Sequence, residues 1–155
     1  MRLYRLPVQA SERDIDGNGH VNNIVYVQWM QDAAIAHSTA VGCAAATTAA
    51  GCTWVARSHH IEYLRPAFAG DRITVFTWVI DALRKSSSTR RYRMVRDSDG
   101  AVVARGETLW VFIEVQSGRP RTIPPEVIQC FEVVPPEEEP SLGLTLHTPP
   151  AVPTG

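Results

Sequence analysis

One ten-residue segment, Asp14 to Asn23, holds most of the side chains in this sequence that could do chemistry. The segment places two carboxylates, one imidazole and three carboxamides close together: Asp14, Asp16, His20, Asn18, Asn22 and Asn23. An apolar run follows at once, and either Asn22 or Asn23 would be a good N-cap for a helix that begins there. The free N–H groups and the dipole of a helix N-terminus favour negative charge. The segment therefore predicts acyl-transfer chemistry, in which negative charge develops on a carbonyl oxygen.

Asp16 and His20 are the residues of this segment best suited to attack a carbonyl or to transfer a proton. Asp16 is the candidate nucleophile or general base; the alternative is a structural role, because Asp-Gly in a loop commonly forms an Asx turn. His20 is a candidate general acid/base, or it orients Asp16; the alternative is a histidine bonded only to loop backbone. The main-chain N–H of Asn23, in the first helical turn, could stabilise an oxyanion.

The same residues carry a family resemblance. Asp16, Asn18 and His20, followed by Val21-Asn22-Asn23 and an aromatic-rich helix, resemble the signature of hotdog-fold acyl thioesterases of the 4-hydroxybenzoyl-CoA thioesterase-like family. The plant acyl-carrier-protein thioesterases are related to that family. Later segments follow the family's usual order: 61–67, Gly70-Asp71, 106–111, 118–120 and Ile123-Pro124. The resemblance covers roughly residues 1–131.

The resemblance implies an α+β hotdog fold, with a long central helix wrapped by a curved antiparallel sheet. It implies that Asp16 attacks the thioester carbonyl or activates water, that Asn18 polarises the thioester or holds the base, and that the oxyanion donor lies near Asn22 or Asn23. The implied substrate is an acyl-CoA or, as a second choice, an acyl carrier protein thioester, with no metal or organic cofactor. It also implies a homodimer with two shared sites, whose dimers can pair into tetramers.

A second group of polar residues is expected to bind substrate. A serine run at an expected turn between two strands, 86–88, is bracketed by the basic residues Arg84, Lys85, Arg90, Arg91 and Arg93. Basic groups and hydroxyls there could hold the phosphates of coenzyme A. A solvated charged turn would look the same in sequence. The predicted substrate-binding residues are Asn22, Arg57, His59, Arg84, Lys85, Ser86 and Ser87, with Arg57 and His59 at a subunit seam.

Metal binding is not expected, although His59 and His60 adjoin Glu62. Neighbouring residues of a strand point to opposite faces, and no second cluster completes a ligand set. The acyl pocket is expected to depend on Tyr26, Trp29, Met30, Trp54 and the Ala/Thr segment 43–51.

The elements that would position these residues follow from periodicity and turn signals. A first strand is expected over 3–10 and a helix from Asn22 to Val41, ended by Gly42. This helix is apolar on nearly all sides, so we expect it to be enclosed on several of them. The segment 43–51 predicts either a second short helix or a flexible lid. Further strands are expected over 53–65, 72–83, 89–96 and 101–115, and a short helix over 124–131.

Composition favours one domain among the 155 residues, with 45% hydrophobic residues and a net charge of −1. This charge argues against nucleic acid or a membrane as the main partner. The N-terminal residues lack the apolar run of a signal peptide, and the three cysteines are odd in number without CxxC spacing, so we predict reduced thiols and a cytoplasmic protein. The domain is expected over 1–134, followed by a disordered Pro/Glu-rich tail, 135–155.

Two other functions fit parts of the pattern. Hotdog enoyl-CoA hydratases also use Asp, Asn and His in one loop, but with the histidine five residues after the aspartate and a proline between. Here His20 is four residues after Asp16, and Gly19 precedes it. The second alternative is a non-catalytic acyl-binding or assembly protein that has kept the fold.

Overall fold

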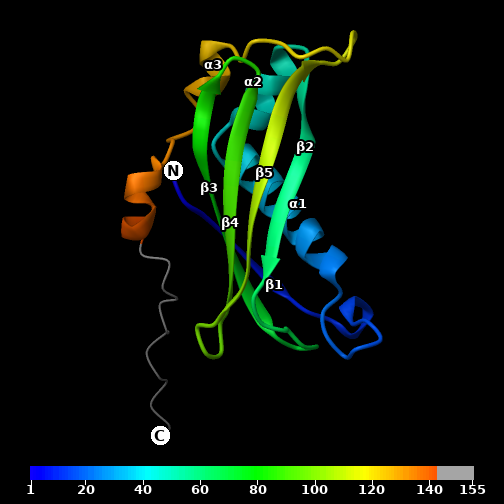
Figure 1. Ribbon diagram of the computed structural model, residues 1–155. Helices are drawn as coiled ribbons and strands as arrows, with labels where there is room; N and C mark the ends of the chain where they lie inside the picture. The colour runs from blue at the N-terminus through cyan, green and yellow to red at the C-terminus, as the bar shows by residue number, and fades with distance from the viewer. Residues whose placement is uncertain (143–155) are drawn as a thin grey trace, which may run out of the picture.

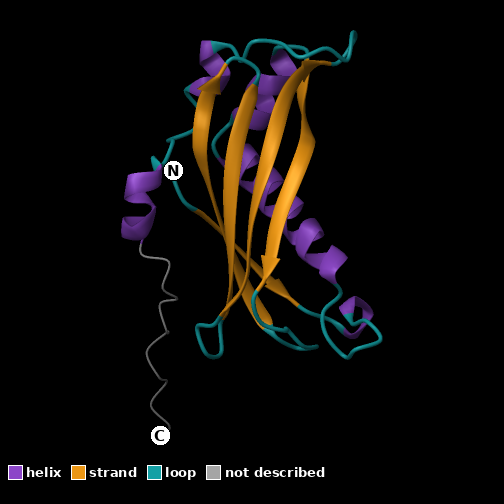
Figure 2. Cartoon of the chain, in the orientation of Figure 1, coloured by secondary structure: helices purple, strands orange, loops and turns teal. Residues whose placement is uncertain are grey.

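The computed structural model describes residues 1–142, without the side chains of 82–84 and 140–142. It contains the strands β1 (Tyr4–Gln9), β2 (Cys52–Tyr63), β3 (Arg72–Arg84), β4 (Ser87–Arg96) and β5 (Val102–Glu114). Its α-helices are α1 (Asn23–Ala40), α2 (Cys43–Ala49) and α3 (Pro125–Ile128), and two 3₁₀ turns cover Glu12–Asp14 and Pro136–Leu142 (Figure 2). Each strand and helix expected from the sequence is found within a few residues of its predicted bounds. The ambiguous segment 43–51 is mostly the helix α2.

The strands form one antiparallel sheet in the order β1-β3-β4-β5-β2, so β1 and β2 are its edges. The sheet curves around α1, which lies against one of its faces (Figure 1). The expected α+β architecture, a long helix wrapped by a curved antiparallel sheet, is therefore confirmed. The consecutive strands β3, β4 and β5 are joined by short turns, whereas β2 pairs with β5 across a longer span of chain.

Helix α1 begins and ends where its sequence signals place it. The side-chain oxygen of Asn22 accepts a hydrogen bond from the N–H of Ile24 at 3.1 Å, so Asn22 is the N-cap. After Val41 the chain turns at Gly42, whose φ of +80° lies in the left-handed region that glycine adopts most easily.

The main core lies between α1 and the sheet. The predicted apolar stripe of the helix is buried there: Tyr26, Trp29, Met30 and Ala33. Met30 packs so closely over Gly106 of β5 that a Cβ added at Gly106 would lie 2.9 Å from the Met30 sulfur. Gly106 therefore lets the helix approach the sheet at this crossing.

One side of α1 is not enclosed within a single chain. Ile24 is 71% exposed and Ile35 is 62% exposed, which differs from the expectation of a helix covered on several sides. The sheet covers only the stripe that faces it, so the apolar residues on this other side remain open. The neighbouring edge strand β2 is also exposed along most of its length.

The first part of the tail that was expected to be disordered, up to Leu142, is ordered in the structure. Residues Pro136–Leu142 form a 3₁₀ turn, and Glu139 accepts hydrogen bonds from the indole N–H of Trp78 at 2.7 Å and from Arg91 at 2.6 Å. The acidic residues that suggested disorder here find partners on the outer face of the sheet. Residues 143–155 lie outside the described residues, and the boundary of the domain stays a prediction.

Candidate active site

The segment before α1 folds into a small closed loop. Ile15 and Val21 form an isolated antiparallel bridge, and within it the N–H of Asp16 donates to the carbonyl of His20 at 2.8 Å. Gly19, with a φ of +79°, makes the sharp turn that brings its own N–H within 3.1 Å of the Asp16 carbonyl. The loop is therefore fixed by its own backbone.

The carboxylate of Asp16 is held by this loop. Its Oδ1 accepts hydrogen bonds from the N–H groups of Asn18 at 2.9 Å and His20 at 3.3 Å. Asp16 can therefore form an Asx turn and still act in catalysis, because the turn uses only the Oδ1 oxygen of its carboxylate. The other oxygen, Oδ2, has no hydrogen-bond partner among the residues that the structure describes, and the side chain is partly exposed. A carboxylate fixed through one oxygen can attack or accept a proton with the other.

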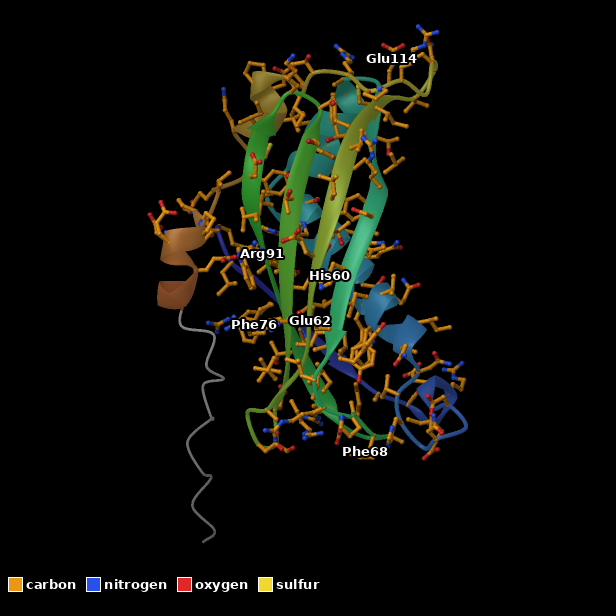
Figure 3. The ribbon with its side chains drawn as sticks, in the orientation of Figure 1. His60, Glu62, Phe68, Phe76, Arg91 and Glu114 are labelled. Carbon is orange, nitrogen blue, oxygen red and sulfur yellow. The ribbon has the colours of Figure 1, made fainter. Side chains whose placement is uncertain are left out.

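Asn18 and His20 present their side chains to solvent on the same loop. The imidazole of His20 lies edge-on to the ring of Phe68, with ring centroids 5.4 Å apart. Phe68 itself is 45% exposed (Figure 3). His20 and Asn18 are thus available to a bound molecule.

In the first turn of α1, the backbone N–H of Asn23 is available to a bound molecule. The side-chain oxygen of Asn22 accepts a hydrogen bond from the N–H of Ile24 at 3.1 Å, and its carbonyl oxygen accepts one from the N–H of Val25 at 3.0 Å. The N–H of Asn23 has no acceptor among the described residues, whereas its carbonyl accepts the hydroxyl of Tyr63 at 3.1 Å. The helix N-terminus beside Asp16 can therefore stabilise a developing oxyanion through Asn23.

The segment after β2 holds the loop and the helix start in place. The N–H of Val21 donates to the carbonyl of Ala67 at 2.8 Å. Arg96 binds the carbonyl of Pro66 at 2.9 Å and the carboxylate of Asp71 at 3.4 Å. These contacts hold the Pro66-Ala67 and Gly70-Asp71 segments next to the Asp16 loop in space.

A cavity of about 560 Å³ lies at the other end of α1, between that helix, α2 and the sheet. Its lining includes Ser38, Thr47, Trp54, Ser88, Arg90 and Trp110. Of the residues expected to shape an acyl pocket, Trp54 and the Ala/Thr segment line this cavity. Tyr26, Trp29 and Met30 do not, because they face the sheet near the start of the helix and are used in the core.

Arg90 was grouped in sequence with the basic residues around the serine run, but the structure buries it in a cluster beside this cavity. The side chain is 3% exposed, and its Nη1 donates to Nδ1 of His37 at 2.9 Å and to the hydroxyl of Thr77 at 3.1 Å. The Phe131 ring lies 5.5 Å from the guanidinium carbon. Arg90 and His37 are 53 positions apart in the sequence. Their contact can be found only once the pairing and register of the strands are known.

His37 is neutral in this cluster. Burial, and secondarily the positive charge of Arg90, lowers the pKa of His37 from 6.5 to about 4. Since Arg90 can only donate, Nδ1 of His37 must accept, and Nε2 carries the proton that is donated to the carbonyl of Met1 at 3.1 Å.

Of the predicted substrate-binding residues, Asn22 adjoins the Asp16 loop as the N-cap of α1, whereas those at the β3–β4 turn lie apart from Asp16 within one chain. Lys85 and Ser86 form the turn between β3 and β4, with Ser87 as the first residue of β4; the Arg84 side chain lies outside the described residues. Figure 1 shows this turn next to α3, at the opposite end of the sheet from the loop before α1.

Arg57 and His59 lie on the edge strand β2. Arg57 stands at a β-bulge, where the pairing with β5 shifts register, and Nδ1 of His59 lies 2.8 Å from the hydroxyl of Thr108. Nε2 of His60 lies 3.8 Å from Oε1 of Glu62, which also pairs with Arg105. His60 and Glu62 are labelled in Figure 3. Within the described residues, no three His, Cys, Asp or Glu side chains are grouped so that they could hold a metal ion. In the same part of the chain, no helix has the length and apolar character needed to cross a membrane.

The fold and the loop together define a class of protein. Residues 11–131 match the model of the thioesterase-like superfamily, and the chain belongs to that superfamily. The architecture is the hotdog fold expected from the sequence. It is similar to that of the 1,4-dihydroxy-2-naphthoyl-CoA thioesterase from Synechocystis, with a TM-score of 0.72, 19% identity and coverage of 82% of this chain and 93% of that chain.

Two further relatives extend the comparison. A 4-hydroxybenzoyl-CoA thioesterase variant in complex with 4-hydroxybenzoyl-CoA gives a TM-score of 0.75 at 20% identity, over 85% of this chain and 100% of that chain. The curated L-carnitine dehydrogenase/betainyl-CoA thioesterase of Agrobacterium fabrum is 29% identical over 139 residues, or 90% of this chain. This chain spans only 28% of the length of that relative.

Proposed function

We propose that this protein hydrolyses an acyl-CoA thioester to the free acid and CoA. The observation that carries the proposal is that Asp16, held through one carboxylate oxygen, lies on the loop that leads into α1. The first N–H of that helix, from Asn23, has no acceptor in the described part of the chain. Membership of the thioesterase-like superfamily supports the reaction class. Acyl carrier protein thioesters remain the second choice of substrate.

In this mechanism the thioester carbonyl oxygen points at the N–H of Asn23. Asp16 either attacks the carbonyl carbon, forming an anhydride that water then opens, or removes a proton from the water that attacks. In both routes negative charge collects on the carbonyl oxygen and is stabilised by Asn23 and the helix dipole. Collapse of this intermediate breaks the C–S bond and releases CoA as the thiolate. The product of this collapse is the free acid in the water route and the Asp16 anhydride, hydrolysed afterwards, in the other. Asn18 and His20 position the thioester from the exposed side of the loop.

A dimer would bring the loop and the cavity together. Asn23 and the cavity residue Ile35 lie twelve residues apart on α1, which is about 18 Å along a helix. If two β2 edges pair antiparallel about a two-fold axis near Arg57 to His59, the end of one β2 lies beside the start of the other. Because Tyr63 at the end of β2 binds the start of α1, the partner's Asp16 loop would then adjoin the cavity at Trp54.

Exposed apolar residues support this assembly. Ile24, Ile35, Val55 and Tyr63 are 71%, 62%, 40% and 45% exposed on α1 and β2. An open strand edge with apolar neighbours is normally covered. We therefore propose an obligate homodimer with two shared sites, able to pair further into tetramers. The three free cysteines support the cytoplasm as its location.

The reaction is tested by incubating the purified protein with a panel of acyl-CoAs, from acetyl to palmitoyl and including aromatic ones, and a thiol reagent. Release of free CoA is expected. A hydratase would instead consume enoyl-CoA without releasing thiol, and a binding protein would do neither. Light scattering at micromolar concentration tests the assembly, since a monodisperse species at 17.1 kDa would contradict the shared site.

A further inference from the structure

Arg90 is a buried cation with no anionic partner in the described part of the chain. It lies on β4, two strands in from the β2 edge, and lines the cavity. Its hydrogen bonds go to the imidazole of His37 and the hydroxyl of Thr77, both of them neutral. The contact with the Phe131 ring adds no negative charge either.

Burying a charge without a counter-ion is unfavourable, and proteins normally pair such a group. Among the described residues no Asp or Glu lines the cavity, so this chain does not supply an anion from that side. Desolvation by burial accordingly lowers the pKa of Arg90 below its ordinary value. An arginine remains protonated in such a setting, and it is a strong site for a carboxylate that enters the cavity.

The other polar groups of the cavity also suit an acceptor. Ser88 lies two residues from Arg90 on the same face of β4 and is 7% exposed. The indole of Trp110, which is paired with Ser88 across the β4–β5 ladder, also lines the cavity. The lining thus places the hydroxyl-bearing Ser88 on the same face as a buried cation.

We propose that Arg90 binds a carboxylate at the far end of the acyl chain, so that the cavity selects ω-carboxyl acyl-CoAs. The inference rests on the proposed thioesterase function and names its substrate class. With the thioester at the β2 edge, Arg90 lies two interstrand spacings, about 10 Å, further in. A dicarboxylic acyl group entering from that edge would place its free carboxylate against the guanidinium. The same charge disfavours a cationic acyl group such as betainyl.

Turnover of matched acyl pairs tests the proposal. Succinyl, glutaryl, adipoyl and suberyl-CoA are each compared with the monocarboxylic acyl-CoA of the same carbon number. At the best length we expect kcat/KM to favour the ω-carboxyl substrate by about 10- to 100-fold, the scale of a hydrogen bond to a charged group. Hydrolysis of all acyl-CoAs without this preference would overturn the inference while leaving the proposed function standing.

Two substitutions locate the effect. Arg90→Met should bring the ratio within each pair close to one, and Arg90→Lys should retain part of the preference. Arg93→Met is the matched control, because Arg93 lies on the same strand with its side chain on the opposite face. The ratio is measured within one protein sample, so partial unfolding of a variant cancels. An unchanged ratio in Arg90→Met would overturn the proposal.

Binding of thioether analogues separates recognition from catalysis. Calorimetry should show that S-(5-carboxypentyl)-CoA binds the wild-type protein more tightly than S-hexyl-CoA, and that Arg90→Met removes the difference. These probes cannot be hydrolysed, so the result stands even if no acyl-CoA is turned over. Equal affinity of the two analogues, tested at each chain length, would overturn the proposal.

Discussion

The two ends of α1 carry polar groups of opposite character. At the N-terminal end, Asp16 receives hydrogen bonds from residues two and four positions along the chain, and its neighbours face solvent. At the C-terminal end, His37 is 1% exposed and contacts Met1 and Arg90, which lie 36 and 53 positions away. One end is organised locally and the other by the tertiary fold.

The difference suits two separate tasks. A reacting carboxylate must meet water and substrate, so an exposed loop held by its own backbone is adequate. A group that distinguishes one acyl chain from another is more effective where water is excluded, because electrostatic interactions are stronger there. In the proposed mechanism, chemistry and recognition therefore lie at opposite ends of one helix. A dimer would then join the two ends of different chains.

The largest expected effect is at Asp16. Asp16→Asn should lower kcat by about 10²–10⁴-fold, the usual contribution of a positioned acid or base, and leave the melting temperature nearly unchanged. Asp14→Asn is the control, because that carboxylate binds Ser11 at the start of the 3₁₀ turn instead. Near-wild-type turnover in folded Asp16→Asn would remove Asp16 from the mechanism.

Mixed dimers test whether the two ends work together across subunits. Ala34 lines the cavity and is buried, so Ala34→Phe should fill the cavity and inactivate the protein by itself. When this variant and Asp16→Asn are refolded together, activity should recover to about a quarter of wild type, because about half of the dimers are mixed and each contains one intact site. Failure to recover, with mixed dimers present, would place the whole site within one chain.

A smaller effect is expected at the β3–β4 turn. Replacing Arg84 and Lys85 with Ala should raise KM for acyl-CoA about two- to fivefold with kcat unchanged, the scale of exposed charge pairs. An acyl-pantetheine substrate, which lacks the nucleotide, should not respond to the change. If it responds equally, the turn does not bind the CoA phosphates.

The smallest effect concerns stability and pH at His37. The unfolded histidine binds a proton near pH 6.5, whereas the folded one does so only near pH 4. Between these values the unfolded state binds more protons, so acidification lowers the free energy of unfolding over this range. In His37→Asn the melting temperature should fall less from pH 7 to pH 4.5 than in wild type. Equal pH profiles would show that His37 is not buried as a neutral group.

The sequence predicted the locally organised end well and the other end poorly. The Asn22 cap and the closed Asp16 loop depend on residues a few positions apart, so spacing alone locates them. The Arg90 cluster depends on which strands pair and in what register. In sequence, Arg90 could not be told apart from Arg91 and Arg93, with which it was expected to hold phosphates or face solvent. Trp29 and Met30 were assigned to the pocket because periodicity shows that a face is buried but not what it is buried against. The contact of Glu139 with Trp78 was missed for a similar reason, since composition does not reveal a docking surface.

The sheet order has a consequence for how the chain folds. Strands β3, β4 and β5 follow one another as a meander and can pair as soon as each has formed, whereas β2 precedes β3 in sequence but pairs with β5. On the ribosome β2 therefore emerges well before its partner, and it must wait while the three central strands are made. Because closing a long loop precedes the contacts that stabilise it, we expect the docking of β2 to be a late step in folding. Until then the backbone of β2 is unpaired and open to aggregation.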